Sequence, residues 1–159
     1  MKKILILQGG LNEEHKVSIN TANEVAKVLT KLKIDFIRFT VNPKTFVRDI
    51  SRFSNKHICF NSLHGSFGED GKIQKILKKK GFSFTHSNQN SSINCFNKIK
   101  SKEIIKKYKI LTPSHKLVKI KDIDHKYLEK ISIKFKKFVL KPVSSGSSYG
   151  LKVIKSKKD

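Results

Sequence analysis

Cysteine is scarce in this sequence of 159 residues, and long apolar runs are missing. Its two cysteines, Cys59 and Cys95, form no Cys-x-x-Cys pair, so we expect no disulfide framework and a reducing, cytoplasmic setting. No run of apolar residues is long enough to cross a bilayer, which argues against a membrane partner. The short basic and apolar start meets Gln8 and two glycines without a small-residue cleavage site, so it predicts a first strand and not a signal peptide.

Arginine is also scarce, although the formal net charge is +23 and the pI is near 10.1. Only Arg38, Arg48 and Arg52 are arginine among the 35 basic residues. Arginine is preferred for base readout and phosphate forks, whereas these lysines are spread over every segment. No interleaving of aromatic and basic residues of the RRM type is present. The charge therefore does not predict a nucleic-acid partner, and lysine-rich usage of this kind fits an AT-rich genome.

Apolar runs alternate with helical periods over residues 1–90. A helix is expected after Asn12, another short one after Pro43 carrying Phe46 and Ile50, and a third through Ile73, Ile76 and Leu77. The predicted strands are Lys3–Leu7, Ile34–Val41, Ile58–Leu63 and Phe82–Thr85. Such alternation predicts an α/β domain with a doubly wound parallel sheet. The buried face of the first helix is expected to hold Ala22, Val25, Ala26, Leu29 and Leu32.

Residues 91–159 predict a second unit of different character. A helix face holds Ser101, Ile104, Ile105 and Tyr108 before Pro113 ends it. Lys116–Val118 is a candidate strand, and Ile123–Phe135 is a candidate helix. Phe138–Pro142 and Leu151–Ile154 enclose a loop of small residues and predict an antiparallel hairpin. Because a hairpin with one or two helices is a thin core, we expect this second domain to be incomplete.

The loop that follows the third strand carries His64-Gly-x-x-Gly-Glu-Asp-Gly71. Glycines let a backbone bend tightly there, Asp70 is placed to cap the next helix, and Gly81 to end it. In open α/β sheets ligands bind at the carboxyl ends of strands, so this loop predicts a binding site. The alternative is a glycine-rich connector.

The loop Val143–Gly150 combines small residues with four serines and follows Lys141. Exposed backbone N–H groups, hydroxyls and an ammonium group all suit an anion, so a mobile phosphate flap is predicted. The pattern is not that of a P-loop, and a flexible surface hairpin is the alternative. Glu14, His64 and Lys98 are ambiguous singly, since each has an ordinary structural role. No histidine spacing suits zinc, and no metal site is expected in this chain.

These features occur in one order: Gly9-Gly10, Glu14, Val17-Ser18, the His64 motif, Lys98, Leu111-Thr-Pro113, and Val139-Leu-Lys-Pro followed by Gly146-Ser-Ser-x-Gly150. The order resembles the D-alanine–D-alanine ligase family of the ATP-grasp superfamily, from Lys3 to about Ile154. The resemblance implies that residues 1–90 form a Rossmann-like substrate domain. Residues 91–159 would form the first part of an α+β ATP-grasp nucleotide domain.

The family joins two D-alanines with ATP and Mg²⁺ through an acyl phosphate, for the peptidoglycan precursor and hence for cell wall and cell shape. By resemblance, Glu14 holds the ammonium group of the first D-alanine, and Val17 and His64 lie in the same pocket. Ser147 links the glutamate to the substrates and also lies at ATP, together with Ser148. Lys98 and Lys141 hold ATP phosphates. The resemblance places the metal ligands beyond Asp159, so we expect the chain alone to be inactive; a homodimer is compatible with it.

The chain departs from the family pattern at His15-Lys16, where arginine and glutamate usually stand, at Asn97 in place of aspartate, and at Tyr149 in place of a small aliphatic residue. Two alternatives stay open at this point. One is another ATP-grasp carboxylate–amine ligase, against which Glu14 and His64 argue. The other is a non-catalytic basic binding module, which a steep salt dependence of nucleic-acid retention would favour.

Overall fold

The computed structural model describes residues 3–155 and contains a parallel sheet and a separate antiparallel hairpin. None of the helices within that range is both long and apolar enough to cross a membrane. The elements are β1 (Ile4–Gly9), α1 (His15–Lys31), β2 (Phe36–Val41), α2 (Phe46–Asp49), η1 (Ile50–Arg52), β3 (Ile58–Asn61), α3 (Lys72–Lys79), β4 (Ser83–Phe84), α4 (Gln89–Phe96), α5 (Lys98–Lys107), η2 (Ile120–Asp122), α6 (His125–Phe135), β5 (Phe138–Leu140) and β6 (Lys152–Ile154).

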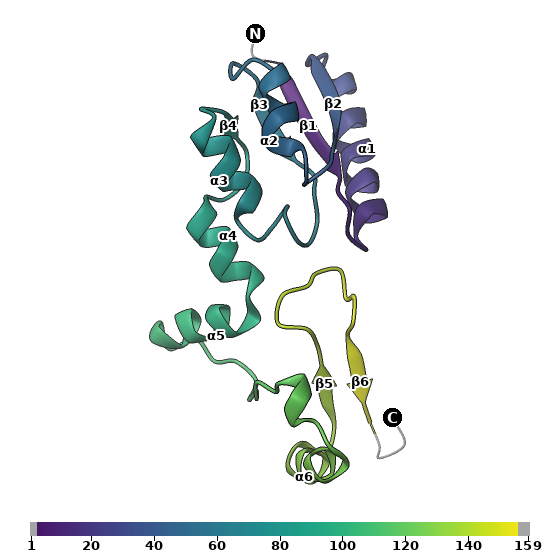
Figure 1. Ribbon diagram of the computed structural model, residues 1–159, viewed down its shortest axis with the longest axis vertical. Helices are drawn as coiled ribbons and strands as arrows, with labels where there is room; N and C mark the ends of the chain where they lie inside the picture. Colours follow the sequence, from purple (N-terminus) through teal and green to yellow (C-terminus); the bar gives the residue numbers. More distant parts are fainter. Residues whose placement is uncertain (1–2, 156–159) are drawn as a thin grey trace.

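The four-stranded sheet has the order β2-β1-β3-β4, and all its pairs are parallel. The predicted α/β class with a parallel sheet is therefore confirmed. β1 runs on to Gly9, two residues further than predicted, because Gln8 and Gly9 pair with Thr40 and Val41 of β2. The strands' carboxyl ends all point the same way, toward the second unit (Figure 1).

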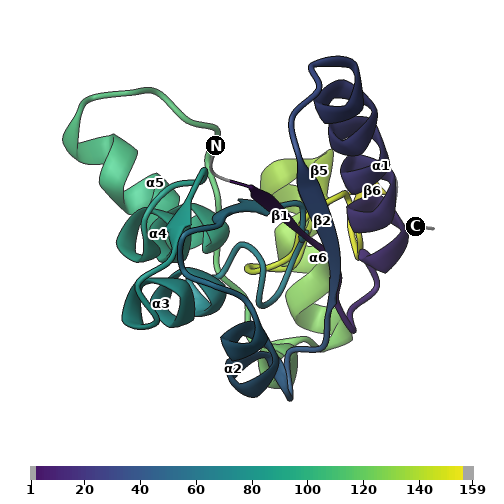
Figure 2. The same cartoon turned by 90° about the horizontal axis from the view of Figure 1, so that it is seen from above.

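The core lies on both faces of β1, as the alternation of side chains along a strand requires. Leu5 and Leu7 join a buried cluster under α2 and α3, whereas Ile6 faces the other way, onto Ala22 and Ala26 of α1. Seen from above, α1 and α3 lie on opposite sides of the strands (Figure 2). Leu32 was expected on the buried face of α1, but it follows the last helical residue and is mostly exposed.

The C-terminal end of α3 agrees with the prediction, whereas its N-cap is a different residue from the one predicted. Gly81, with φ +75°, follows the C-cap residue Lys80, as predicted. The N-cap is Gly71, however, so Asp70 does not cap from that position. Its Oδ1 instead accepts the backbone N–H of Lys72, the first helical residue, at 3.0 Å. The carboxylate still satisfies one of the free N–H groups of the first turn.

The second unit contains the predicted helices α5 and α6 and the antiparallel β5–β6 hairpin. It also contains α4, a helix that the sequence analysis did not predict. The strand expected at Lys116–Val118 is wrong: this segment has no regular secondary structure, and within the described residues it pairs with no neighbour. A segment needs a hydrogen-bonded neighbour to become a strand, and local composition cannot supply one.

Burial divides the chain sharply. No described residue after Phe82 is buried, although many are apolar; Leu111 is 98% exposed and Ile120 is 90% exposed. The two units lie end to end, and the loop between β5 and β6 reaches the lower end of the parallel sheet (Figure 1). That meeting place, at the carboxyl ends of the strands, is where the sequence predicts a site.

Candidate functional site

Glu14 is a buried carboxylate with a free oxygen. It is the N-cap residue of α1, only 1% exposed, and its Oε1 has no hydrogen-bond partner. Its backbone is fixed, since its N–H donates to Asn12 Oδ1 at 3.0 Å and its carbonyl accepts the N–H of Ser18. Burying a carboxylate costs free energy unless a cation or donor compensates for the lost water. The position therefore suits a positively charged ligand group.

His64 faces α1 from the loop after β3. Its Nε2 lies 2.8 Å from Thr21 Oγ1, and Thr21 donates its single hydroxyl proton to the carbonyl of Val17 at 3.1 Å. The Thr21 oxygen must then accept from His64, which places the imidazole proton on Nε2 and leaves a lone pair on Nδ1. Asn12 holds the same loop by donating from Nδ2 to the carbonyls of His64 and Ser66.

Glu69 completes a group that the sequence analysis did not assemble. Its Oε2 accepts the backbone N–H of Gly65 at 2.7 Å, and its own N–H donates back to the Gly65 carbonyl. One ligand atom from each of Glu14, His64 and Glu69 lies within 4.8 Å of the others. Glu69 was present in the quoted motif, five residues after His64, but nothing in its local spacing showed that its carboxylate turns toward α1.

Gly65 is required at this point for two reasons. Its φ is +70°, a conformation that side chains rarely adopt, and a methyl group there would overlap Glu14 Oε2. The loop backbone therefore lies directly against the buried carboxylate. This close approach explains why glycine follows His64.

The β5–β6 loop, residues 141–151, comes to the same place from the second unit. Lys98, the first residue of α5, donates from Nζ to the carbonyl of Ser145 at 2.6 Å and from its backbone N–H to the carbonyl of Val143 at 3.0 Å. Gly146 follows, and a β-carbon at that position would stand 2.9 Å from Glu14 Oε1. Lys98 thus fixes the loop where it covers the Glu14 carboxylate.

The pKa of the Lys98 ammonium group depends on burial and on the charges around it. Burial lowers the pKa of its ammonium group from the ordinary 10.5, and the positive charge of Lys141 lowers it further, while the negative charges of Glu14 and Glu69 oppose both effects. The lowered pKa shows that desolvation and the second lysine outweigh the two carboxylates. Two cations and two anions therefore face one region.

The structure brings Glu14, His64, Lys98 and Lys141 to this region, but it places the remaining predicted residues less closely. Ser147 and Ser148 lie on the exposed loop with φ +44° and +62°, and neither hydroxyl has a hydrogen bond within the described part of the chain. Val17 is half-buried, and its part here is the carbonyl that accepts from Thr21. Their predicted roles stay predictions.

Asn97 shows that one departure from the family pattern is structurally mild. Its Oδ1 accepts the backbone N–H groups of Ile99 and Lys100 and so caps α5. Asparagine and aspartate are about equally good N-caps, so the helix that presents Lys98 keeps its start.

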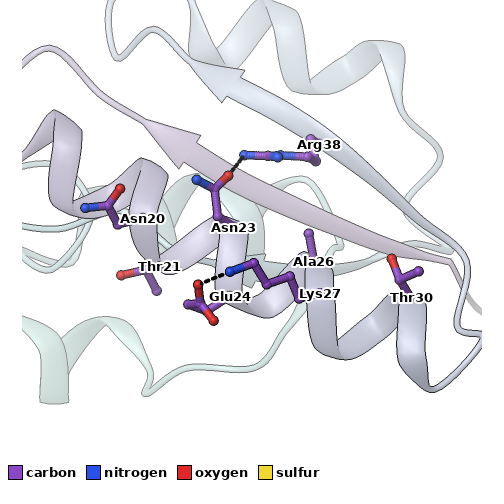
Figure 3. Close-up of a pocket in the computed structure, with 8 residues that line it drawn as sticks. All are labelled: Asn20, Thr21, Asn23, Glu24, Ala26, Lys27, Thr30 and Arg38. Atoms are coloured by element: carbon purple, nitrogen blue, oxygen red, sulfur yellow. Dashed lines mark hydrogen bonds and ion pairs between the residues drawn. The ribbon is translucent and has the colours of Figure 1, made fainter.

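A surface pocket elsewhere holds none of the predicted residues. It lies between α1 and β2, where Arg38 donates to Asn23 at 2.7 Å and Lys27 pairs with Glu24 (Figure 3). The pocket is lined by Asn20, Thr21, Asn23, Glu24, Ala26, Lys27, Thr30 and Arg38. Its charged side chains Arg38, Lys27 and Glu24 are already paired, and none of its lining residues is a buried carboxylate with a free oxygen such as that of Glu14.

Comparison with known proteins finds relatives along nearly the whole chain, although no family model matches it. A D-alanine–D-alanine ligase of Pelagibacter ubique is 41% identical over 152 residues, covering 92% of this chain and 48% of that protein. One of Bacillus anthracis is 35% identical and covers 98% and 50%. The chain spans about half the length of the curated relatives it matches.

Solved structures agree. The crystal structure of a D-alanine–D-alanine ligase from Bacillus anthracis matches with a TM-score of 0.79 and 32% identity, over 99% of this chain and 51% of that one. The same organism's ligase complexed with ATP matches with a TM-score of 0.77 and 31% identity, over 99% and 52%.

Proposed function

Because this chain is homologous to the N-terminal half of D-alanine–D-alanine ligases, we propose that it serves ATP-dependent ligation of two D-alanines. The relatives are about twice as long. The proposal therefore assigns to these residues the binding of one amino acid and of ATP phosphates, and leaves the other steps to residues outside the matched half. The dipeptide would serve the peptidoglycan precursor.

The observation that carries the proposal is the buried, unpartnered Oε1 of Glu14 beneath the hairpin loop. The ammonium group of an amino acid supplies the positive charge and the N–H donors that this oxygen lacks. His64 lies beside it, hydrogen-bonded to Thr21, and so has a fixed ring orientation for contact with the same ligand.

The two lysines support the phosphate side of the proposal. Lys98 and Lys141 lie close enough for each charge to act on the other, which lowers the pKa of the Lys98 ammonium. The carboxylates of Glu14 and Glu69 offset the repulsion between the two lysines only in part, and a triphosphate would relieve the rest. The backbone N–H groups of the loop that follows Lys141 add further donors for an anion.

The hairpin loop supplies the third part of the mechanism. An acyl phosphate is hydrolysed by water, so the pocket that forms it must exclude solvent. Gly146 already lies over Glu14, and Lys98 ties the loop to α5 through Ser145. In this proposal Ser147 and Ser148 act from the same loop, Ser147 between the glutamate and the substrates and Ser148 at the nucleotide.

Magnesium belongs to the proposed reaction, but the described residues do not fit it. Mg²⁺ prefers oxygen ligands in an octahedron and keeps several waters. The only cluster of potential metal ligands within residues 3–155 includes the imidazole of His64. We therefore derive no step through Mg²⁺ from this chain.

The test is D-alanine binding by the 159-residue chain, measured by isothermal titration calorimetry with ATP present. Wild type is expected to bind D-alanine, and Glu14→Gln to bind it at least about tenfold more weakly, about 1.4 kcal/mol, because the ammonium loses its charged partner. Glu24→Gln, a change of an exposed carboxylate on the same helix, is the matched control.

Two results would contradict the proposal. One is D-alanine affinity that Glu14→Gln leaves unchanged. The other is a chain that retains its fold by circular dichroism but binds neither D-alanine nor ATP.

A further inference from the structure

We infer that Glu14, His64 and Glu69 form a binding site for a transition-metal dication, with Zn²⁺ the best fit. The residues come from the start of α1 and from the loop after β3, and their ligand atoms lie within 4.8 Å of one another. The site is distinct from the magnesium of the proposed reaction.

A second observation, which also carries the proposed function, points to a ligand here. Glu14 is 1% exposed, and its Oε1 has no partner. That oxygen faces the cluster, because a β-carbon at Gly146 would lie 2.9 Å from it and 3.4 Å from Glu69 Oε2. A buried carboxylate oxygen without a donor is expensive, and a metal ion would satisfy it.

The donor set selects the metal. Two carboxylates and one imidazole supply three ligands and a charge of about −2, and Zn²⁺ commonly takes three protein ligands and one water. Imidazole favours zinc, copper and nickel, whereas magnesium and calcium favour all-oxygen sites. The dication would also neutralise the buried carboxylate of Glu14 and the more exposed carboxylate of Glu69 together.

The groups behind the ligands are arranged as metal sites require. Thr21 fixes the proton of His64 on Nε2 and leaves Nδ1 with its lone pair. The backbone N–H of Gly65 holds Glu69 Oε2 at 2.7 Å, and this oxygen keeps a second lone pair for a ligand. Such outer hydrogen bonds orient metal ligands and strengthen binding.

The positive charge near the site opposes binding of the metal ion, so zinc affinity should depend on salt in a defined way. Lys98 and Lys141 face the same region, and the chain carries a net charge of +23. Long-range repulsion is screened by salt, whereas contacts inside a partly buried site are screened much less. Zinc affinity is therefore expected to rise, or to stay level, as salt increases from about 20 to 200 mM.

One consequence rests on the proposed function: zinc and the ammonium group of D-alanine would use the same Glu14 oxygen. Zinc would then exclude the amino acid, and saturating D-alanine would weaken zinc binding. The metal site itself does not depend on that function.

The experiment titrates Zn²⁺ into the metal-free 159-residue chain in competition with a chromophoric chelator. We expect one strong site per chain, and at least a tenfold loss of affinity in both His64→Gln and Glu69→Gln. His115→Gln, a change of an exposed histidine outside the cluster, is expected to leave affinity unchanged. Co²⁺ is expected to give the intense visible absorption of a low-coordinate site in wild type and to lose it in both cluster variants.

Glu69→Gln keeps an acceptor for the Gly65 N–H, and circular dichroism checks that each variant is folded. Equal zinc affinity in wild type and both folded cluster variants, or no strong site in wild type, would overturn the inference. D-alanine binding measured with EDTA present separates the two ideas. Binding of D-alanine without a zinc site would overturn only the metal inference, and zinc binding without D-alanine binding would overturn only the proposed function.

Discussion

Gly146 of the hairpin loop lies against the carboxylate of Glu14, so closely that a β-carbon there would stand 2.9 Å from Oε1. The two residues are far apart in the sequence and belong to different units. Through this contact the hairpin loop of the second unit covers the buried carboxylate of the first.

Gly146→Ala is expected to push the loop away from Glu14, because the added methyl group is nearer than non-bonded atoms normally approach. Hydrogen exchange of the loop amides, residues 143–150, should then become faster. Ser144→Ala, a change at an exposed position of the same loop, is the control. Unchanged exchange in the Gly146 variant would show that the carboxylate simply rotates aside.

Lys98→Met is expected to release the loop from α5. The ammonium hydrogen bond to the carbonyl of Ser145 is lost, and hydrogen bonds to charged groups are worth about 1.5–3 kcal/mol. Exchange of the loop amides should rise about tenfold or more, and ATP affinity, measured by calorimetry, should fall. Lys106→Met, a change of an exposed lysine on the same helix, should alter neither. Identical exchange in both variants would remove Lys98 as the fastening residue.

Two substitutions near Lys98 should shift the pKa of its ammonium group in opposite directions. Its ammonium pKa lies below the ordinary 10.5 because of burial and the charge of Lys141, opposed by Glu14 and Glu69. Lys141→Met should therefore raise the pKa of Lys98, and Glu69→Gln should lower it further. NMR titration of ¹³C-dimethylated lysines, with the Lys98 signal assigned through Lys98→Arg, measures each value. A shift of the opposite sign in either variant would contradict the arrangement of charges.

Ser18→Ala is expected to destabilise the first unit by about 1–3 kcal/mol. The buried Ser18 Oγ accepts the backbone N–H of Gly9 at 2.7 Å, and no water can replace it at a position that is fully buried. Urea unfolding followed by circular dichroism gives the change in free energy. Ser51→Ala, at an exposed position, should change it by less than about 0.5 kcal/mol. Equal losses of unfolding free energy in the two variants would show that the hydrogen bond from Gly9 to Ser18 does not stabilise the fold.

The parallel sheet could be predicted from the sequence because each of its strands is marked by a short run of neighbouring apolar residues. Runs such as Leu5, Ile6 and Leu7 are apolar without alternation, which is typical of a strand covered on both faces. The positions of Phe46 and Ile50 were predicted for the same reason, and both are fully buried. Helix α4 was missed because its polar residues and single stripe of Ile93 and Phe96 give little periodicity.

The site could be predicted only in part. Glu14 and His64 stand out in their motifs, but the sequence does not show that Glu69 turns back to join them or that Thr21 sets the proton of His64. These contacts join residues that are 43 or more positions apart, with the exception of the short return from Gly65 to Glu69. Such pairings depend on how the units pack, which no local pattern records.

The strand order also constrains how the chain acquires its structure. β1 is synthesised before β2 and β3, and it pairs with both of them. The edge of β1 that pairs with β3 therefore stays unpaired until about fifty further residues have been synthesised. During synthesis on the ribosome, that apolar strand is an exposed template for wrong partners until Ile58–Asn61 emerges. Formation of the Glu14–His64–Glu69 cluster must come later still, so the timing of chain emergence sets when any ligand can first be held.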